Sequence, residues 1–167
     1  MNITNEELLK LATKIEGEGK NFYLELSKYI ENPEVKDFLL LMAKEESMHE
    51  IQFKKLLDEK GDLHYGWEKN ESLRELIDTQ FQTDIFPPLE EVFKHLPKFQ
   101  GIKKAIDFAV EAEKVSSEFY GLLQEACTDI ESKTILVLME KAEQEHLERV
   151  EMIRDRYLAE SSENKSS

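Results

Sequence analysis

The chain has 167 residues, enough for one domain with a sizeable core, and it carries 36 acidic against 22 basic residues for a formal net charge of −14. This charge argues against nucleic acid or an anionic membrane surface as a partner, and it fits a protein that attracts cations. The single cysteine, Cys127, excludes an internal disulfide or a Cys-x-x-Cys site and favours a reducing, cytoplasmic compartment.

The first predicted helix covers residues 5–31. The segment before it is polar and acidic, so we expect no signal peptide. Thr4 followed by Glu7 is typical of a capping box, which begins a helix. Apolar or small residues then recur in alternating steps of three and four, the period of an amphipathic helix. Glu16 lies in the gap of that apolar series.

The second predicted helix covers residues 33–60. Asn32 suits the N-cap, Pro33 suits the first helical position, and Gly61 is a typical stop. The apolar series of this helix includes Glu46 and His49, which are three residues apart and therefore share a face. The longest apolar run of the chain, residues 38–43, is far too short to span a bilayer.

Residues 61–100 form a different region, with one tryptophan, four phenylalanines and three prolines. This composition is too apolar for a free linker. We expect short helices at about residues 71–78 and 89–95. We also expect the segment to pack on the rest of the chain or across the interface of a homodimer.

The third and fourth predicted helices form a second hairpin over residues 101–159. The third begins near Gly101 and carries Glu113 in its apolar series. Asp129 is a suitable N-cap for the fourth, whose series includes Glu143 and His146. Residues 161–167 are polar and are predicted to be a disordered tail. Residues 1–160 would then form a single domain.

The two hairpins are copies of each other. A shift of 97 positions aligns residues 12–49 with the second half without a gap, and 13 of these 38 positions are identical. Unrelated segments would share roughly 2 to 3, at about 7% identity per position. Two antiparallel hairpins joined by one long crossover describe an all-α, ferritin-like four-helix bundle.

Six residues of the repeat are candidate metal ligands. Counting from the hairpin turns at about 1.5 Å per residue places them at one level, mid-bundle. Four buried carboxylates would be very costly if ionised and unpaired, and the apolar faces contain no Arg or Lys to pair with them. Oxygen and nitrogen ligands without thiolate suit iron or manganese, and zinc is also compatible. The six residues are Glu16, Glu46, His49, Glu113, Glu143 and His146.

Several other residues share these helix faces. Tyr23 and Tyr120 follow Glu16 and Glu113 by seven residues, so they could hydrogen-bond to ligands or simply pack in the core. Gly19 and Ser116 could leave room for dioxygen or peroxide, or could allow close helix packing. A set of exposed acids could supply a partner to a ligand histidine behind the metal. These acids are Glu18, Glu45, Glu50, Glu111 and Glu145.

The pattern resembles the rubrerythrin-like branch of the ferritin-like superfamily. The resemblance covers about residues 8–158 and is carried by the motif at 15–23 and by Lys44-Glu45-Glu46-x-x-His49, each repeated in the second half. It implies a non-haem di-iron site in which Glu16 and Glu113 are terminal ligands. It also implies that Glu46 and Glu143 bridge two iron ions and that each histidine binds one of them.

Two departures from that family are visible. Full rubrerythrins carry a rubredoxin domain whose iron site needs four cysteines, whereas this chain has one cysteine. Electrons would therefore have to come from an external donor. Rubrerythrins also carry a carboxylate three residues after the ligand of the third helix, where this chain has Ser116. The ligand set of four Glu and two His is more similar to that of bacterioferritin.

Three functions therefore remain open from the sequence. The first is an oxidoreductase that reduces hydrogen peroxide or dioxygen, as in defence against oxidative stress. The second is a ferroxidase or iron-binding protein that takes Fe(II) as substrate. The third is a non-catalytic helical module that metal stabilises.

Overall fold

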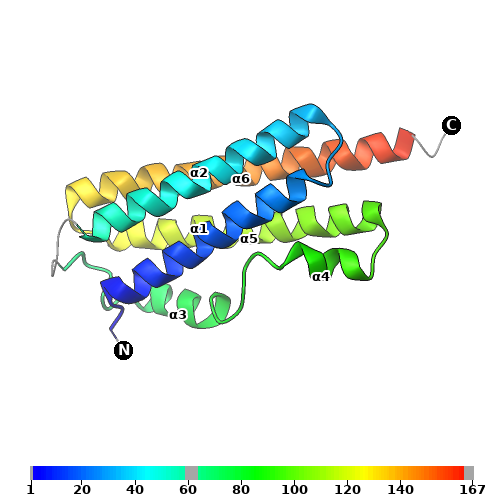
Figure 1. Ribbon diagram of the computed structural model, residues 1–167. Coiled ribbons are helices and arrows are strands. Elements are labelled where there is room, and N and C mark those ends of the chain that lie inside the picture. Colours follow the sequence, from blue (N-terminus) through cyan, green and yellow to red (C-terminus); the bar gives the residue numbers. More distant parts are fainter. Residues whose placement is uncertain (1, 59–63, 164–167) are drawn as a thin grey trace.

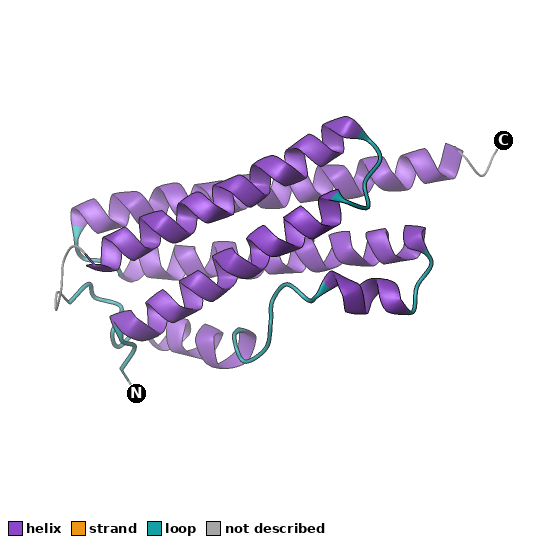
Figure 2. Cartoon of the chain, in the orientation of Figure 1, coloured by secondary structure: helices purple, strands orange, loops and turns teal. Residues whose placement is uncertain are grey.

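The computed structural model describes residues 2–58 and 64–163, and six helices and no strand lie in this part of the chain (Figures 1 and 2). The helices are α1 (Asn5–Ser27), α2 (Pro33–Asp58), α3 (Glu71–Gln80), α4 (Leu89–Lys94), α5 (Lys98–Ala126) and α6 (Ile130–Glu163). None of the helices in these residues has both the length and the apolar character needed to cross a bilayer.

Four long helices form the bundle. α1 packs along α2 and α5 packs along α6, each pair antiparallel and joined by a short turn (Figure 1). The hairpins meet through contacts of α2 with α6 and of α1 with α5. This arrangement confirms the prediction of an all-α bundle made of two hairpins joined by a long crossover.

Side chains cap the helices where the sequence suggested. Thr4 accepts a hydrogen bond from the Glu7 amide at 3.1 Å, and Asn32 accepts one from the Val35 amide at 3.2 Å. The Asp129 carboxylate accepts a bond from the Ser132 amide at 2.9 Å. Each cap satisfies an amide that has no partner inside its own helix.

Some predicted helix ends were wrong. α1 ends at Ser27 rather than residue 31, because the chain needs several residues to turn before Pro33 begins α2. α5 begins at Lys98, so Gly101 lies inside its first turn. There a Cβ would come within 2.6 Å of the Phe93 ring. α6 continues to Glu163, so residues 161–163 of the predicted tail are helical. The predicted stop at residue 61 and residues 164–167 lie outside the described residues.

The crossover between α2 and α5 packs on the bundle of its own chain. α3 and α4 both contact α5, and α4 also contacts α1. Trp67 is fully buried, and its indole nitrogen donates to the Asn5 side chain at 3.2 Å. Phe86 is buried against Phe22 and Tyr23, at ring distances of 5.2 and 5.7 Å. The crossover therefore closes one side of the bundle.

The apolar core is divided into two clusters. On α1, Leu8, Ala12 and Ile15 belong to one cluster, whereas Phe22 and Leu26 belong to the other. The same division runs through α2, α5 and α6. Buried Glu and His side chains occupy the level between the clusters. The fold thus encloses a polar centre between two apolar layers.

Candidate metal centre

The six predicted ligands converge at mid-bundle. α1 and α5 contribute one glutamate each, and α2 and α6 each contribute a Glu-x-x-His pair. All six are at most 6% exposed. They form two groups with donor atoms that lie within 4.8 Å of one another. We call these the His49 position (Glu16, Glu46, His49, Glu143) and the His146 position (Glu46, Glu113, Glu143, His146).

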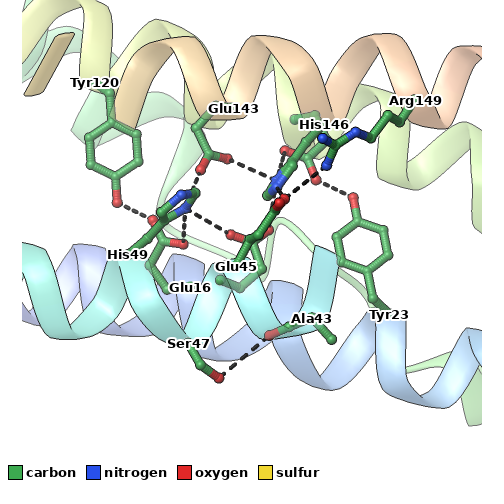
Figure 3. A network of polar contacts seen from close by, with 12 residues as sticks. Glu16, Tyr23, Ala43, Glu45, Ser47, His49, Tyr120, Glu143, His146 and Arg149 are labelled. Carbon is green, nitrogen blue, oxygen red and sulfur yellow. Dashed lines mark hydrogen bonds and ion pairs between the residues drawn. The ribbon is translucent and has the colours of Figure 1, made fainter. Parts of the chain in front are cut away.

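At the His49 position, three carboxylates surround one imidazole nitrogen. His49 Nδ1 lies 2.8 Å from Glu143 Oε1 and 3.4 Å from both Glu16 Oε2 and Glu46 Oε2. Figure 3 shows the side chains of Glu16, His49 and Glu143 pointing toward one another from α1, α2 and α6. Atoms that bind one metal ion at about 2 Å lie roughly 3 to 4 Å apart, so these separations suit a shared ion.

The His146 position repeats the arrangement with the other oxygens. His146 Nδ1 lies 3.5 Å from Glu46 Oε1, 3.8 Å from Glu113 Oε2 and 3.9 Å from Glu143 Oε2. Glu46 and Glu143 therefore offer one oxygen to each position, whereas Glu16 and Glu113 each serve one. The two imidazole rings are stacked with centroids 5.6 Å apart.

Two tyrosines hold the unshared glutamates. The Tyr120 hydroxyl donates to Glu16 Oε1, and the Tyr23 hydroxyl donates to Glu113 Oε1. Each bond joins one hairpin to the other, which the sequence did not reveal. The second oxygen of each glutamate is then left to face the centre. Burial, together with the nearby glutamate charges, raises the pKa of both phenols, so both remain neutral donors.

Burial makes the charges of this centre costly. It raises the pKa of Glu46 and Glu113 well above the usual range, and neighbouring carboxylates add to the effect. The pKa of Glu143 rises to about 7 for the same two reasons. Burial alone would lower the pKa of His49, but contacts with Glu143, Glu16 and Glu46 outweigh it and raise the pKa. Without a cation, the centre therefore retains protons.

Buried oxygen and nitrogen atoms without hydrogen bonds also converge on this centre. Within the described residues, one inward-facing atom of each of the six side chains is buried and makes no hydrogen bond, although some lie close to one another. Buried polar atoms normally find partners, so a set of orphans that converges suits a bound cation. These atoms are Glu16 Oε2, Glu46 Oε2, His49 Nδ1, Glu113 Oε2, Glu143 Oε1 and His146 Nδ1. The donor set and its spacing fit two divalent ions.

One of the five acids predicted to be exposed, Glu45, is half-buried and contacts a candidate ligand on the side away from the centre. Glu45 Oε2 lies 2.7 Å from His146 Nε2 and accepts a hydrogen bond from Arg149 at 2.9 Å (Figure 3). The sequence could name Glu45 only among five candidates, and it missed Arg149. Its spacing could have identified Arg149, since it follows His146 by three residues and therefore lies on the same helix face.

The small residues beside the centre have different surroundings. A Cβ on Gly19 would lie 2.9 Å from Glu46 Oε1 and 3.2 Å from the Phe86 ring. Gly19 thus allows close packing of Glu46 rather than an open space. Ser116 is buried, and its hydroxyl makes no hydrogen bond to the described residues. The sequence also missed Phe86, because its contact with this level depends on how the crossover folds back.

Comparison with known proteins gives a consistent result. The family model described as Rubrerythrin matches residues 7–153. A solved structure of a hypothetical protein from Pyrococcus furiosus is similar at 26% identity, covering 94% of this chain and 92% of that one, with a TM-score of 0.71. A structure named as a putative ferritin-like diiron-carboxylate protein from Thermotoga maritima is similar at 23% identity, with coverages of 92% and 96% and a TM-score of 0.69. No curated protein matches the chain.

Proposed function

This chain belongs to the rubrerythrin family, and from that premise we propose that it is a di-iron oxidoreductase that reduces hydrogen peroxide or dioxygen. The observation that carries the proposal is the sharing of Glu46 and Glu143 between two groups of donor atoms. The diiron-carboxylate name of the Thermotoga structure, which has the same fold, agrees with it. Manganese or zinc would suit the same oxygen and nitrogen ligands, so the choice of iron rests on the family.

Each candidate ligand has a defined task in this proposal. Glu16 and His49 would complete one iron position, and Glu113 and His146 would complete the other. Glu46 and Glu143 would serve both ions, because each side chain directs one carboxylate oxygen to each position. Bound there, the iron pair would supply the two electrons that, with two protons, convert hydrogen peroxide into two water molecules.

The protein side chains prepare this centre for redox chemistry. Tyr23 and Tyr120 hold the terminal glutamates in place by hydrogen bonds, so we assign them a positioning role. The two apolar clusters exclude bulk water from the level between them, which strengthens every charge interaction there. With one cysteine, the chain cannot build a four-cysteine iron site, so a separate protein or reductant would return the electrons.

A second candidate function is oxidation of Fe(II) as a substrate. Ser116 favours it, because this buried side chain stands where rubrerythrins carry a further carboxylate. Without that further carboxylate, the candidate ligand set of four glutamates and two histidines resembles the ligand set of bacterioferritin. In this case iron would enter, be oxidised and leave, rather than serve as a resident store of electrons.

One experiment separates the two functions. The protein is loaded with Fe(II) without oxygen and mixed in stopped flow with hydrogen peroxide and, separately, with dioxygen. Much faster oxidation by peroxide, followed by turnover with an added reductant, supports the proposed oxidoreductase. Fast oxidation by dioxygen with continued uptake of Fe(II) favours iron handling. Stabilisation by metal without any turnover would contradict both and leave a structural role.

The expected homodimer bears on iron handling. Storage in a cage requires many subunits, whereas a redox enzyme of this fold does not. Light scattering of the intact chain measures the mass directly. A monomer or dimer would exclude cage storage, and a large assembly would favour it.

A further inference from the structure

The repeat is broken beside the metal centre. A shift of 97 positions relates Glu45 on α2 to Ala142 on α6. Glu45 reaches across to the other hairpin, where its Oε2 lies 2.7 Å from His146 Nε2 (Figure 3). Ala142 stands at the equivalent place for His49 and offers only a methyl group. The pseudo-symmetry of the six ligands therefore does not extend to the groups behind the two histidines.

Arg149, which holds Glu45 in place, also differs between the two halves of the repeat. Arg149 Nη1 donates to the same oxygen of Glu45 at 2.9 Å, and Arg149 Nη2 lies 3.8 Å from Glu145. The repeat counterpart of Arg149 is the exposed Gln52, which carries no charge. The side chains of Arg149 and Glu45 are each 29% exposed, so this pair lies between the buried His146 and the solvent. Within the described residues, only His146 has a carboxylate–arginine pair of this kind behind its ring.

The contact decides which nitrogen of His146 can bind a metal. A carboxylate at hydrogen-bond distance from Nε2 favours the tautomer with its proton on Nε2. Nδ1, which faces Glu46, Glu113 and Glu143, is then left with a free electron pair. A carboxylate behind the ring also makes the imidazole a stronger ligand, and loss of such a partner typically costs about 10- to 100-fold in metal affinity.

We propose that the Glu45–Arg149 pair makes the two metal positions unequal, so that the His146 position binds its ion more tightly and fills first. The proposal rests on the proposed two-metal function. In it, Glu45 is a positioning residue that acts through His146. We expect the His146 position to be roughly 10- to 100-fold tighter than the His49 position, the range that such partners give elsewhere.

Single-position variants test this directly with Co(II) as the probe. Glu16→Ala removes a ligand of the His49 position and leaves the His146 position, whereas Glu113→Ala does the reverse. Equilibrium titration should give tighter binding to Glu16→Ala. Adding Glu45→Ala should weaken binding about 10- to 100-fold in the Glu16→Ala protein and leave the Glu113→Ala protein nearly unchanged.

Three further variants serve as controls. Glu145→Ala removes the other carboxylate near Arg149 without touching His146, so it should change neither affinity strongly. Glu45→Gln keeps an oxygen that can accept from Nε2 and should recover part of the loss. Ala142→Glu supplies the missing carboxylate and should strengthen the His49 position in the Glu113→Ala protein. This gain does not depend on how well any Glu45 variant folds.

The possible outcomes are distinct. Equal losses at both positions, or no loss from Glu45→Ala and no gain from Ala142→Glu, would overturn the proposed inequality. Failure of the unaltered chain to bind either Co(II) or Fe(II) would instead overturn the proposed function. Tight binding in two equal steps would support the function and contradict the inequality.

Discussion

Tyr23 and Tyr120 connect the two hairpins at the level of single atoms. Each donates to the outer oxygen of a glutamate on the opposite hairpin, and the inner oxygen then faces the centre. The same pairing stabilises the fold and orients a candidate ligand. Removal of one hydroxyl leaves a buried carboxyl oxygen without its donor.

We therefore expect Tyr120→Phe to destabilise the metal-free protein by about 1–3 kcal/mol, the usual cost of an unsatisfied buried group. Urea unfolding measures this change. Tyr29→Phe is the matched control, because the Tyr29 ring packs on Phe93 at 4.0 Å and its contact does not involve the hydroxyl. Equal small effects in the two variants would show that the Tyr120 hydroxyl does not support Glu16.

The glutamates themselves make stability depend on pH. The pKa of Glu143 is about 7 in the fold against an ordinary value of 4.5, so the folded state binds this proton more tightly than the unfolded chain does. That contribution is complete below about pH 4.5 and is lost as the pH rises through about 7. The pKa of His49 and His146 is also raised, which acts in the same direction.

We predict that metal-free protein loses melting temperature between about pH 5 and pH 8, and that added Co(II) stabilises it more at about pH 8, where fewer protons compete for the ligands. Thermal melting with and without chelator measures both effects. Glu143→Gln removes one titrating group and should flatten the curve of the metal-free protein. An unchanged slope in Glu143→Gln would contradict the assignment to the buried centre.

At the scale of helices, the sequence predicted the elements well and their ends less well. The periods of three and four located all four long helices, and the Asn32-Pro33 and Asp129 signals placed the starts of α2 and α6. The start of α5 was misplaced because Gly101 was taken as a boundary. The close approach of Phe93, which explains this glycine, is a tertiary contact that no local pattern encodes.

The candidate site shows the same limit. Spacing within a helix and the repeat were sufficient to select all six residues that meet at mid-bundle. The sequence could not separate Glu45 from the four other acids predicted to be exposed, because its partners His146 and Arg149 lie on another helix. For the same reason the sequence could not predict that Tyr23 and Tyr120 donate hydrogen bonds to glutamates of the opposite hairpin.

The crossover gives a prediction at this scale. Phe86 is buried against Phe22 and Tyr23, so Phe86→Ala should cost about 3–5 kcal/mol through the cavity it leaves. Phe38→Ala makes the same chemical change at a side chain that is 39% exposed and should cost much less. Denaturant unfolding compares the two. Similar losses would mean that the crossover does not pack on the bundle as described.

For the whole molecule, the fold and the charge lead to one conclusion. Two apolar clusters stabilise the bundle from its two ends, and the level between them concentrates four carboxylates that no buried lysine or arginine of the described residues neutralises. Two divalent ions would balance four carboxylates. The net charge of −14 would also attract cations toward the protein. Without bound metal, burial of these four carboxylates would destabilise the fold.

The most direct test of the proposed two-metal centre is the number of iron ions bound per chain after loading with Fe(II) without oxygen and removal of the excess. We predict two per chain, one for each group of donor atoms. Glu46→Ala should lower the count, since one side chain serves both positions. No bound iron in the unaltered protein, or a count that Glu46→Ala leaves unchanged, would contradict the shared centre.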